Sequence, residues 1–408
     1  MRERRLVRYL PAPSERMGAL WALLSLGDLM ILEYGPSGTT HYSMEALRSL
    51  GMQGTRGLYT THMDQDAVVM GDMSALSSAI RELDELHKPK YLAVLGSSVS
   101  SLIGADITAL CADMRGEISA RLIPIDHCDF HSDFSLGLRI VMDALVEAMA
   151  QDAASVPGTF NILGVSPDAY GARDDAAEIA RLMEEAFGWK LNAALPWGGG
   201  KDGFCRTARA SINLAIRDET LPSARFLRGK YDTPYHSGMP YGYKGTLDWL
   251  EGVSNIIGAA VNPRVVERLS RKAEAARQPL MINGRRVERF AVIGVYPFVK
   301  GMCGFLEGES GLTPVFRICS HSPETVESPD AAIQFLPEER DWMEQVGNLR
   351  DAILFADDVS LSMARPSVVR VLASHPRILR DRTDNPAMNG YCGERGADLL
   401  YTHNERED

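Results

Sequence analysis

Short apolar runs that stop at a glycine or an acidic residue recur along the chain, and each precedes a segment with helical spacing. Three such runs are residues 29–34, 91–95 and 121–125, and they end at Gly35, Gly96 and Asp126. Continuous apolar runs of this length are typical of strands buried on both faces of a parallel sheet. Their alternation with helical segments predicts βαβ units.

The same pattern restarts twice. After the small-residue stretch 153–158, residues 160–165 read as a strand, and the following helix carries an apolar stripe that ends at Gly188. After a basic helical connector, 265–277, strands are predicted at 289–295, 315–319, 331–336, 352–355 and 359–363. We therefore expect an α/β protein with three Rossmann-like, doubly wound domains and mostly parallel sheets, at residues 1–155, 156–263 and 264–408. In such sheets ligands bind beyond the carboxyl ends of the strands.

Charge, hydropathy and cysteine content argue against several classes of function. A net charge of -11 disfavours broad nucleic-acid binding, which needs a basic surface. The most apolar segment, 19–32, is interrupted by Ser25 and Asp28 and is too short to span a membrane. The six cysteines are scattered, and no CxxC pair occurs. These features predict a cytoplasmic, reduced protein that has no nucleic-acid or membrane partner.

The loops after the strands of the first domain carry unusual side chains. Four of the nine histidines lie there, namely His41, His62, His127 and His131. His127, Cys128 and His131 are a candidate soft-metal site, because thiolate and imidazole suit iron, zinc or copper. The alternative is a buried cysteine between hydrogen-bonded histidines at the end of a strand. The serine-rich loop after residue 96 is equally open to two interpretations, a helix cap or an anion site.

Taken in order, these loops resemble the nitrogenase component 1 family. The matching segments are Gly35-Pro36-Ser37-Gly38-Thr39, the stretch 60–71 with Asp64 at its acidic position, and Ser97-Ser98 leading into 103–107. Further matches are 230–235, 239–242 and 391–397, so the resemblance covers nearly the whole chain. That family has three Rossmann-like domains and includes the two kinds of subunit of light-independent protochlorophyllide reductase and scaffolds for cofactor assembly.

The resemblance implies an iron–sulfur cluster at a subunit interface, but the positions that match its cysteine ligands are Pro11 or Ala12, Thr39 and Ser98. Three explanations stay open: a partner subunit supplies most ligands, the ligands are shifted, or the cluster has been lost and only a pocket remains. Candidate cofactor-binding residues are Thr39, His41, Ser98 and Cys128, and candidate metal ligands are His127, Cys128 and His131. The position that matches the cysteine ligand of the active-site cofactor falls near Arg217, so reduction of dinitrogen is not expected.

The resemblance further implies a subunit of an ATP-coupled reductase. Its partners would be a homologous component 1-like subunit, in a homo- or hetero-oligomer, and an iron-protein-like ATPase that supplies electrons for reduction of a small organic substrate. Tyr235, His236 and Tyr241, in an expected loop of the second domain that is rich in proline and glycine, are candidate residues of the substrate pocket, with surface loop aromatics as the alternative. Two other functions remain open: a non-catalytic scaffold that binds a metallocluster or tetrapyrrole during cofactor maturation, and a small-molecule binding protein without redox activity.

Overall fold

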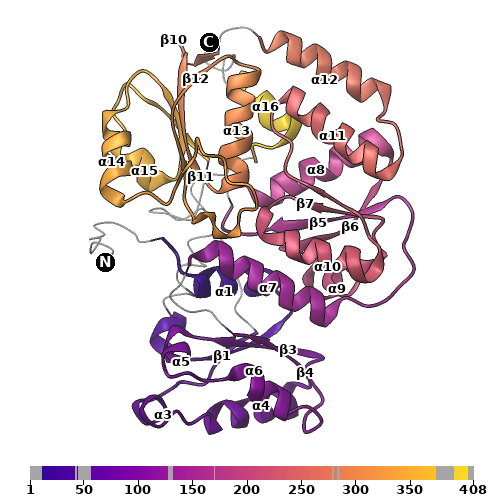
Figure 1. Ribbon diagram of the computed structural model, residues 1–408, viewed down its shortest axis with the longest axis vertical. Coiled ribbons are helices and arrows are strands. Elements are labelled where there is room, and N and C mark those ends of the chain that lie inside the picture. The colour runs from indigo at the N-terminus through magenta and orange to yellow at the C-terminus, as the bar shows by residue number, and fades with distance from the viewer. Residues whose placement is uncertain are drawn as a thin grey trace.

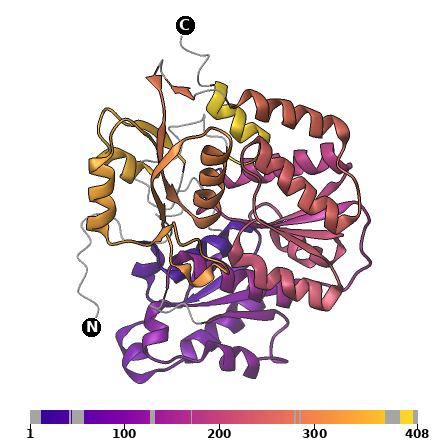
Figure 2. The same cartoon turned by 45° about the horizontal axis from the view of Figure 1, so that its top comes forward.

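Three parallel sheets, each flanked by helices, make up the computed structural model (Figure 1). The structure describes residues 12–41, 44, 57–126, 132–169, 171–277, 280–282, 285–373 and 390–402. Helices α1 (Glu15–Ser25) and α7 (Phe134–Met149) lie between the first sheet and the other two (Figure 1). The turned view in Figure 2 shows the three sheets grouped around this pair of helices. The predicted α/β class with three Rossmann-like domains is confirmed.

The first sheet has the order β2-β1-β3-β4, and every described pair in it is parallel. Its strands are β1 (Met30–Tyr34), β2 (Leu58–Thr60), β3 (Tyr91–Gly96) and β4 (Arg121–Ile125). Helices α3 (Gln65–Met70), α4 (Ser74–His87), α5 (Ser98–Leu102) and α6 (Ile107–Asp113) connect them. All of β3 is buried, as its continuous apolar run predicts.

The second sheet has the order β6-β5-β7-β8 and is also parallel in every described pair. Its strands are β5 (Thr159–Val165), β6 (Lys190–Pro196), β7 (Ile212–Ala215) and β8 (Tyr235–Ser237). The helices around it are α8 (Ala172–Phe187), α9 (Gly200–Cys205), α10 (Leu221–Tyr231) and α11 (Tyr243–Ile257). The predicted stripe of α8 is buried, and Gly188 ends the helix in the left-handed conformation that glycine favours.

The third sheet has the order β13-β12-β11-β14-β15. Its strands are β11 (Arg289–Gly294), β12 (Thr313–Cys319), β13 (Gln334–Phe335), β14 (Ile353–Ala356) and β15 (Val369–Leu372). The connector helix α12 (Pro263–Ala275) precedes it, and α13 (Tyr296–Gly308), α14 (Glu339–Asn348), α15 (Asp358–Met363) and the C-terminal α16 (Gly393–Thr402) follow in order. A short antiparallel ribbon, β9 (Met281–Ile282) and β10 (Arg285–Arg286), stands beside it.

One expected strand of this sheet was wrong, and another is shorter than expected. Residues 359–363 form helix α15, because the Asp357 side chain caps it by accepting the Ser360 N–H at 2.9 Å. Of the strand expected at 331–336, only β13, Gln334–Phe335, forms.

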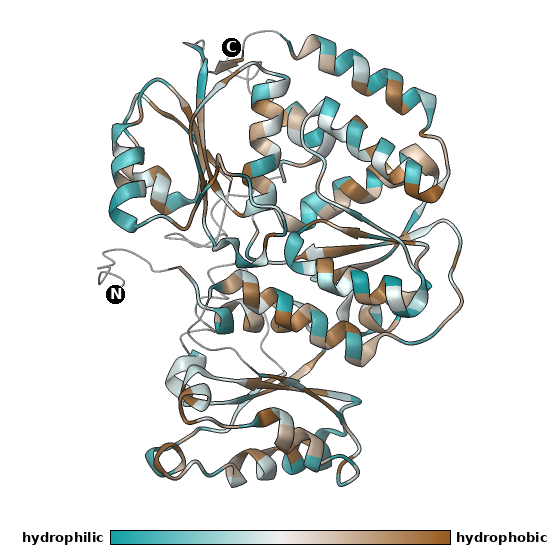
Figure 3. Cartoon of the chain, viewed as in Figure 1, coloured by the Kyte–Doolittle hydropathy of each residue, from teal (hydrophilic) through white to brown (hydrophobic). Residues whose placement is uncertain are grey.

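Two glycines set the spacing between α1 and α7. A Cβ atom on Gly18 would stand 2.0 Å from the Phe134 carbonyl oxygen, and one on Gly137 would stand 1.9 Å from the Glu15 carbonyl oxygen. Only glycine permits backbones to pack this closely. In Figure 3 brown, apolar residues fill the strands, whereas α12 and α14 carry many teal residues. None of the described helices is long and apolar enough to cross a membrane.

Candidate functional site

The carboxyl edge of the first sheet gathers the loops that the sequence singled out. Because β2, β1, β3 and β4 run parallel, the loops that follow them emerge at the same edge. Contacts join them: the Gly35 carbonyl accepts the Met63 N–H at 3.0 Å, and a Cβ on Gly35 would meet Ser97 Cβ at 2.7 Å. The expected convergence of these loops therefore holds for their described parts.

The candidate residues at this edge have ordinary structural surroundings. Thr39 is exposed, and its hydroxyl donates to the Pro36 carbonyl at 2.8 Å. His41 is exposed and Ser98 is half-buried. The neighbouring Ser97 forms a capping box with Ser100, which explains the serine-rich loop as a helix cap. His127, Cys128 and His131 lie outside the described residues.

A buried ion pair underlies this edge, and the sequence analysis missed it. The Arg16 guanidinium of α1 donates to the Glu33 carboxylate of β1, and the hydroxyl of Thr40 donates to the other oxygen of the same carboxylate. Glu33 is fully buried, Thr40 is 5% exposed and Arg16 is 6% exposed. The signal in the sequence was the acidic residue inside the apolar run 29–34, since a buried carboxylate requires a partner.

We tested whether the described donors fit the iron–sulfur cluster that the resemblance implies. Hydroxyls such as those of Thr39 and Ser98 are poor ligands for soft iron. No group of three or more His, Cys, Asp or Glu side chains able to hold a metal ion occurs among the described residues. Burial raises the pKa of the nearby Cys111 thiol to about 12, which disfavours the thiolate that a cluster needs. The described part of this edge does not fit a cluster by itself.

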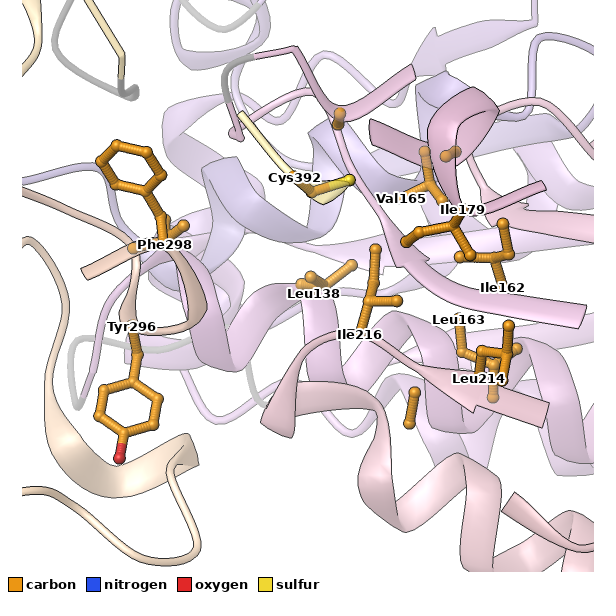
Figure 4. Packing of buried hydrophobic residues seen from close by; sticks show 14 of the residues in the cluster. Leu138, Ile162, Leu163, Val165, Ile179, Leu214, Ile216, Tyr296, Phe298 and Cys392 are labelled. Atoms are coloured by element: carbon orange, nitrogen blue, oxygen red, sulfur yellow. The ribbon is translucent and has the colours of Figure 1, made fainter. Parts of the chain in front are cut away.

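A second site lies where the second and third sheets meet. Residues at or just beyond the carboxyl ends of strands enclose a cavity of about 30 Å³, among them Gly164 of β5, Ile216 after β7, Val295 after β11 and Ala373 after β15. Figure 4 shows Ile216, Phe298 of α13 and Leu138 of α7 within one continuous hydrophobic cluster. Opposed carboxyl edges are the usual place for a ligand in α/β proteins.

Arg217 is the charged centre of this site. Its Nη1 donates to Asp168 Oδ2 at 2.7 Å and its Nη2 donates to Glu219 Oε1 at 2.6 Å, and all three side chains are 2% exposed. Gly164 leaves room for the Arg217 side chain, because a Cβ atom at position 164 would stand only 3.2 Å from Arg217 Cβ. Its φ of +111° is also a conformation that favours glycine. Burial opposes ionisation, but the charge of Arg217 holds the pKa of Glu219 below its ordinary value.

Asp175, in the first turns of α8, also lines the cavity. Burial raises the pKa of this carboxyl to about 7, although its Oδ1 accepts the Cys392 N–H at 3.0 Å. The thiol of Cys392 donates to the backbone carbonyl of Asp175 at 3.4 Å. A segment 217 residues further along the chain therefore covers this carboxyl.

Tyr241 is the predicted pocket residue that the structure places at the cavity. It is 5% exposed, its ring meets the Phe298 ring edge-on at 6.2 Å between centroids, and Gly301 leaves room for it. Burial, together with the charge of Asp175, raises the pKa of the Tyr241 phenol well above its ordinary value, so the hydroxyl stays protonated.

His236 and Tyr235 lie elsewhere, because their segment forms the edge strand β8 rather than a loop. His236 packs edge-on against Trp249 at 5.4 Å between ring centroids. A Cβ on Gly252 would stand 2.5 Å from its Cε1 atom, so the imidazole occupies space beside α11. Burial lowers the pKa of His236, which is therefore neutral at pH 7.

A further buried polar group joins α7 to the third sheet. The N-cap residue of α7, Asp133, accepts the Ser322 N–H at 2.6 Å. His321 is fully buried; its Nε2 accepts the Tyr296 N–H at 3.1 Å, so its Nδ1 donates to the Ser322 carbonyl at 2.9 Å. The imidazole is thereby held in one neutral tautomer. Sequence spacing gave no sign of this group, because 189 residues separate Asp133 from Ser322.

Comparisons with known proteins agree with this architecture. The family model described as "Nitrogenase component 1 type Oxidoreductase" matches residues 14–405. The nitrogenase iron-molybdenum cofactor biosynthesis protein NifE of Clostridium pasteurianum is 25% identical over 251 residues, covering 59% of this chain and 53% of NifE. A light-independent protochlorophyllide reductase polypeptide of Bradyrhizobium sp. (strain ORS 278) is 25% identical over 291 residues, covering 66% of this chain and 54% of that polypeptide. The match thus spans little more than half the length of these relatives.

The solved structure "Nitrogenase Cp1 at pH 6.5" superposes with a TM-score of 0.79 at 17% identity and covers 99% of this chain and 93% of that chain. At 17% sequence identity, this superposition shows a shared fold and nothing further.

Proposed function

The chain belongs to the nitrogenase component 1 type oxidoreductase family, and from that premise we propose that it is a substrate-binding subunit of a nitrogenase-like reductase. In this proposal a small organic substrate binds in the cavity between the second and third sheets, and Asp175 donates a proton to it as it is reduced. The observation that carries the proposal is a buried carboxyl with a pKa of about 7 in the wall of that cavity.

A carboxyl with this pKa suits proton transfer at neutral pH. Both of its protonation states are populated near pH 7, so it can give a proton to a substrate and recover one afterwards. Tyr241, whose hydroxyl stays protonated, and Arg217, which stays charged, would orient polar atoms of the substrate. The apolar remainder of the wall, including Ile216 and Phe298, would keep bulk water away from the reacting atoms.

The electrons are proposed to enter from outside this chain. The described donors at the first sheet do not fit a cluster, so we infer that the redox centre belongs to a homologous component 1-like subunit and that an iron-protein-like ATPase reduces it. An iron–sulfur cluster held mainly by that partner would supply one-electron transfer at low potential. We also propose that the complex works in the cytoplasm.

The test uses the complex purified without oxygen, with MgATP, dithionite and the ATPase partner. Acetylene serves as a small unsaturated probe and dimethyl sulfide as an organosulfur one, and products are measured by gas chromatography. We expect Asp175→Asn to lower the rate about 100-fold, as loss of a general acid does. The matched control is Asp174→Asn, because Asp174 is the exposed neighbour on the same helix turn. Full activity of Asp175→Asn would contradict the role of Asp175.

The second candidate is a scaffold for cofactor maturation, and the similarity to NifE, a cofactor biosynthesis protein by name, favours it. A scaffold would hold iron and sulfide in the purified complex and pass them to an acceptor protein without turning over either probe. Iron and sulfide analysis before and after incubation with the acceptor separates the two functions.

A further inference from the structure

The cavity between the second and third sheets, here called the central cavity, has more acidic than basic side chains in and beside its wall. Arg217 is the only residue with a cationic side chain among the described residues that line it, and Asp175 is the acidic one. Behind Arg217 stand Asp168 and Glu219, both 2% exposed and both bonded to its guanidinium. Two carboxylates therefore face one guanidinium, and Asp175 adds a third carboxyl.

Neighbouring charges do not restore the balance. Glu178, one helix turn beyond Asp175, pairs with Arg181 at 2.7 Å and with Arg395 at 3.4 Å, and Arg181 also pairs with Glu185 and Glu394. Because these cations are already paired with carboxylates outside the cavity lining, they do not neutralise the excess of negative charge at the cavity. An anion that entered would meet repulsion in surroundings of low dielectric, where charges interact more strongly than in water.

The same groups leave hydrogen-bonding capacity unused. Asp168 Oδ1 and the Nε–H of Arg217 are buried and have no protein partner in the described structure. Buried polar atoms nearly always have partners, so a ligand or an ordered water is expected to complete them. A ligand in the cavity would accept from the guanidinium of Arg217 and donate to the carboxyl of Asp175, the two ionisable groups of these kinds in the described lining, with any apolar part against Phe298 or Ile216.

We propose that the central cavity selects a small uncharged or cationic ligand with an N–H or O–H donor and rejects anions such as carboxylates. This inference rests on the proposed function only in taking the cavity as the substrate site. A primary carboxamide or an amidine has the required chemistry. The volume of about 30 Å³ limits a ligand in this conformation to very few non-hydrogen atoms.

Three probes of nearly equal shape test the charge preference: acetamidinium, acetamide and acetate. Binding of each to the full chain is followed by saturation-transfer NMR at pH 7.5, with neither nucleotide nor reductant. We expect acetamidinium and acetamide to bind, and acetate to bind about 100-fold more weakly than acetamide. Acetate binding within tenfold of acetamide overturns the proposal, and so does failure of both acetamide and acetamidinium to bind.

Variants test whether the weaker binding of acetate arises at the cavity. Glu219→Gln removes one buried negative charge and should bring acetate about tenfold closer to acetamide. Asp175→Asn also removes a buried negative charge and should shift the ratio of acetate to acetamide binding in the same direction, but it leaves the ion pairs of Arg217 intact. It replaces Glu219→Gln in the test if circular dichroism shows that Glu219→Gln does not fold. Asp174→Asn, at an exposed position, should leave the ratio unchanged. An unchanged ratio in folded Asp175→Asn overturns the proposal.

The outcomes are separable from those of the proposed function. If acetamide binds selectively but neither acetylene nor dimethyl sulfide is reduced, the charge preference of the cavity is supported and the reductase function is contradicted. If reduction depends on Asp175 but acetate binds as tightly as acetamide, the reductase function is supported and the charge preference is contradicted.

Discussion

The carboxyl edge of the first sheet and the central cavity are both strand-end sites, but their buried charges are arranged differently. Among the described residues at the first sheet one arginine, Arg16, meets one carboxylate, Glu33, which also accepts the hydroxyl of Thr40. At the cavity one arginine, Arg217, serves two carboxylates, and Asp175 stands nearby with a pKa of about 7. A carboxylate that is bonded through both of its oxygens, as Glu33 is, holds structure together, whereas the buried atoms without a protein partner beside the cavity retain the capacity to bind a ligand.

The largest expected effect comes from Arg217→Met. It leaves Asp168 and Glu219 buried without a cation, so the free energy of unfolding should fall by about 5 kcal/mol. Urea denaturation measures this. Arg209→Met, at an exposed position, is the control and should change the value by less than about 0.5 kcal/mol. A loss under about 1 kcal/mol for Arg217→Met would show that water already solvates the two carboxylates.

The next largest effect is a pH dependence of stability that comes from Asp175 at the cavity. The folded-state pKa of Asp175 is about 7, above the ordinary value of 3.8, so the folded state binds more protons between these values. This group therefore lowers stability as pH rises from about 4 to about 7, by up to about 4 kcal/mol. Asp175→Asn should remove that part of the curve in urea titrations at several pH values. A curve identical to that of the wild type would mean that Asp175 has an ordinary pKa.

Arg16→Met tests the pair of Arg16 and Glu33. It leaves Glu33 without its cation, and the expected loss is about 3 kcal/mol, less than for Arg217→Met, which strands two carboxylates among the described residues where Arg16→Met strands one. The double variant Arg16→Met with Glu33→Leu removes both charges and should regain most of that loss. If the double variant is no more stable than the single one, the loss in Arg16→Met does not come from an isolated Glu33 carboxylate, and our structural assignment of this pair is contradicted.

The smallest effect separates two adjacent serines at that edge. Ser97→Ala breaks the capping box of α5 and should cost about 1 kcal/mol. Ser98→Ala, at the half-buried position that matches a cluster ligand in the family, should cost less than about 0.5 kcal/mol. A larger loss at Ser98 than at Ser97 would reverse our assignment of the two residues.

Sequence alone predicted the strands that are formed by mostly apolar runs. The runs at β1, β3, β4, β5, β11, β12 and β14 were identified, as was the amphipathic helix α8. It did not predict β6, which begins with exposed residues, or β8, a three-residue edge strand beside proline and glycine. Residues 359–363 have strand-like composition, but the cap at Asp357 makes them helical. Local patterns fail where a cap or a tertiary contact decides the outcome.

The candidate site was harder to predict for a similar reason. Tyr241 was predicted as a pocket residue and lies at the cavity, whereas His236 from the same segment packs against Trp249. Asp175 was one of several acidic residues at the start of a helix, and only burial under Cys392 distinguishes it. Burial by a partner hundreds of residues away leaves no trace in local spacing.

The contact between Cys392 and Asp175 also orders events during synthesis. The two residues are 217 positions apart, so a growing chain has built all three sheets before the residue that covers Asp175 leaves the ribosome. A polypeptide cut short before residue 390 would contain the strands of all three sheets but would lack α16, and the carboxyl of Asp175 would remain open to water and titrate as a surface aspartate does. The acid would then acquire its raised pKa only when the segment at Cys392 folds over it.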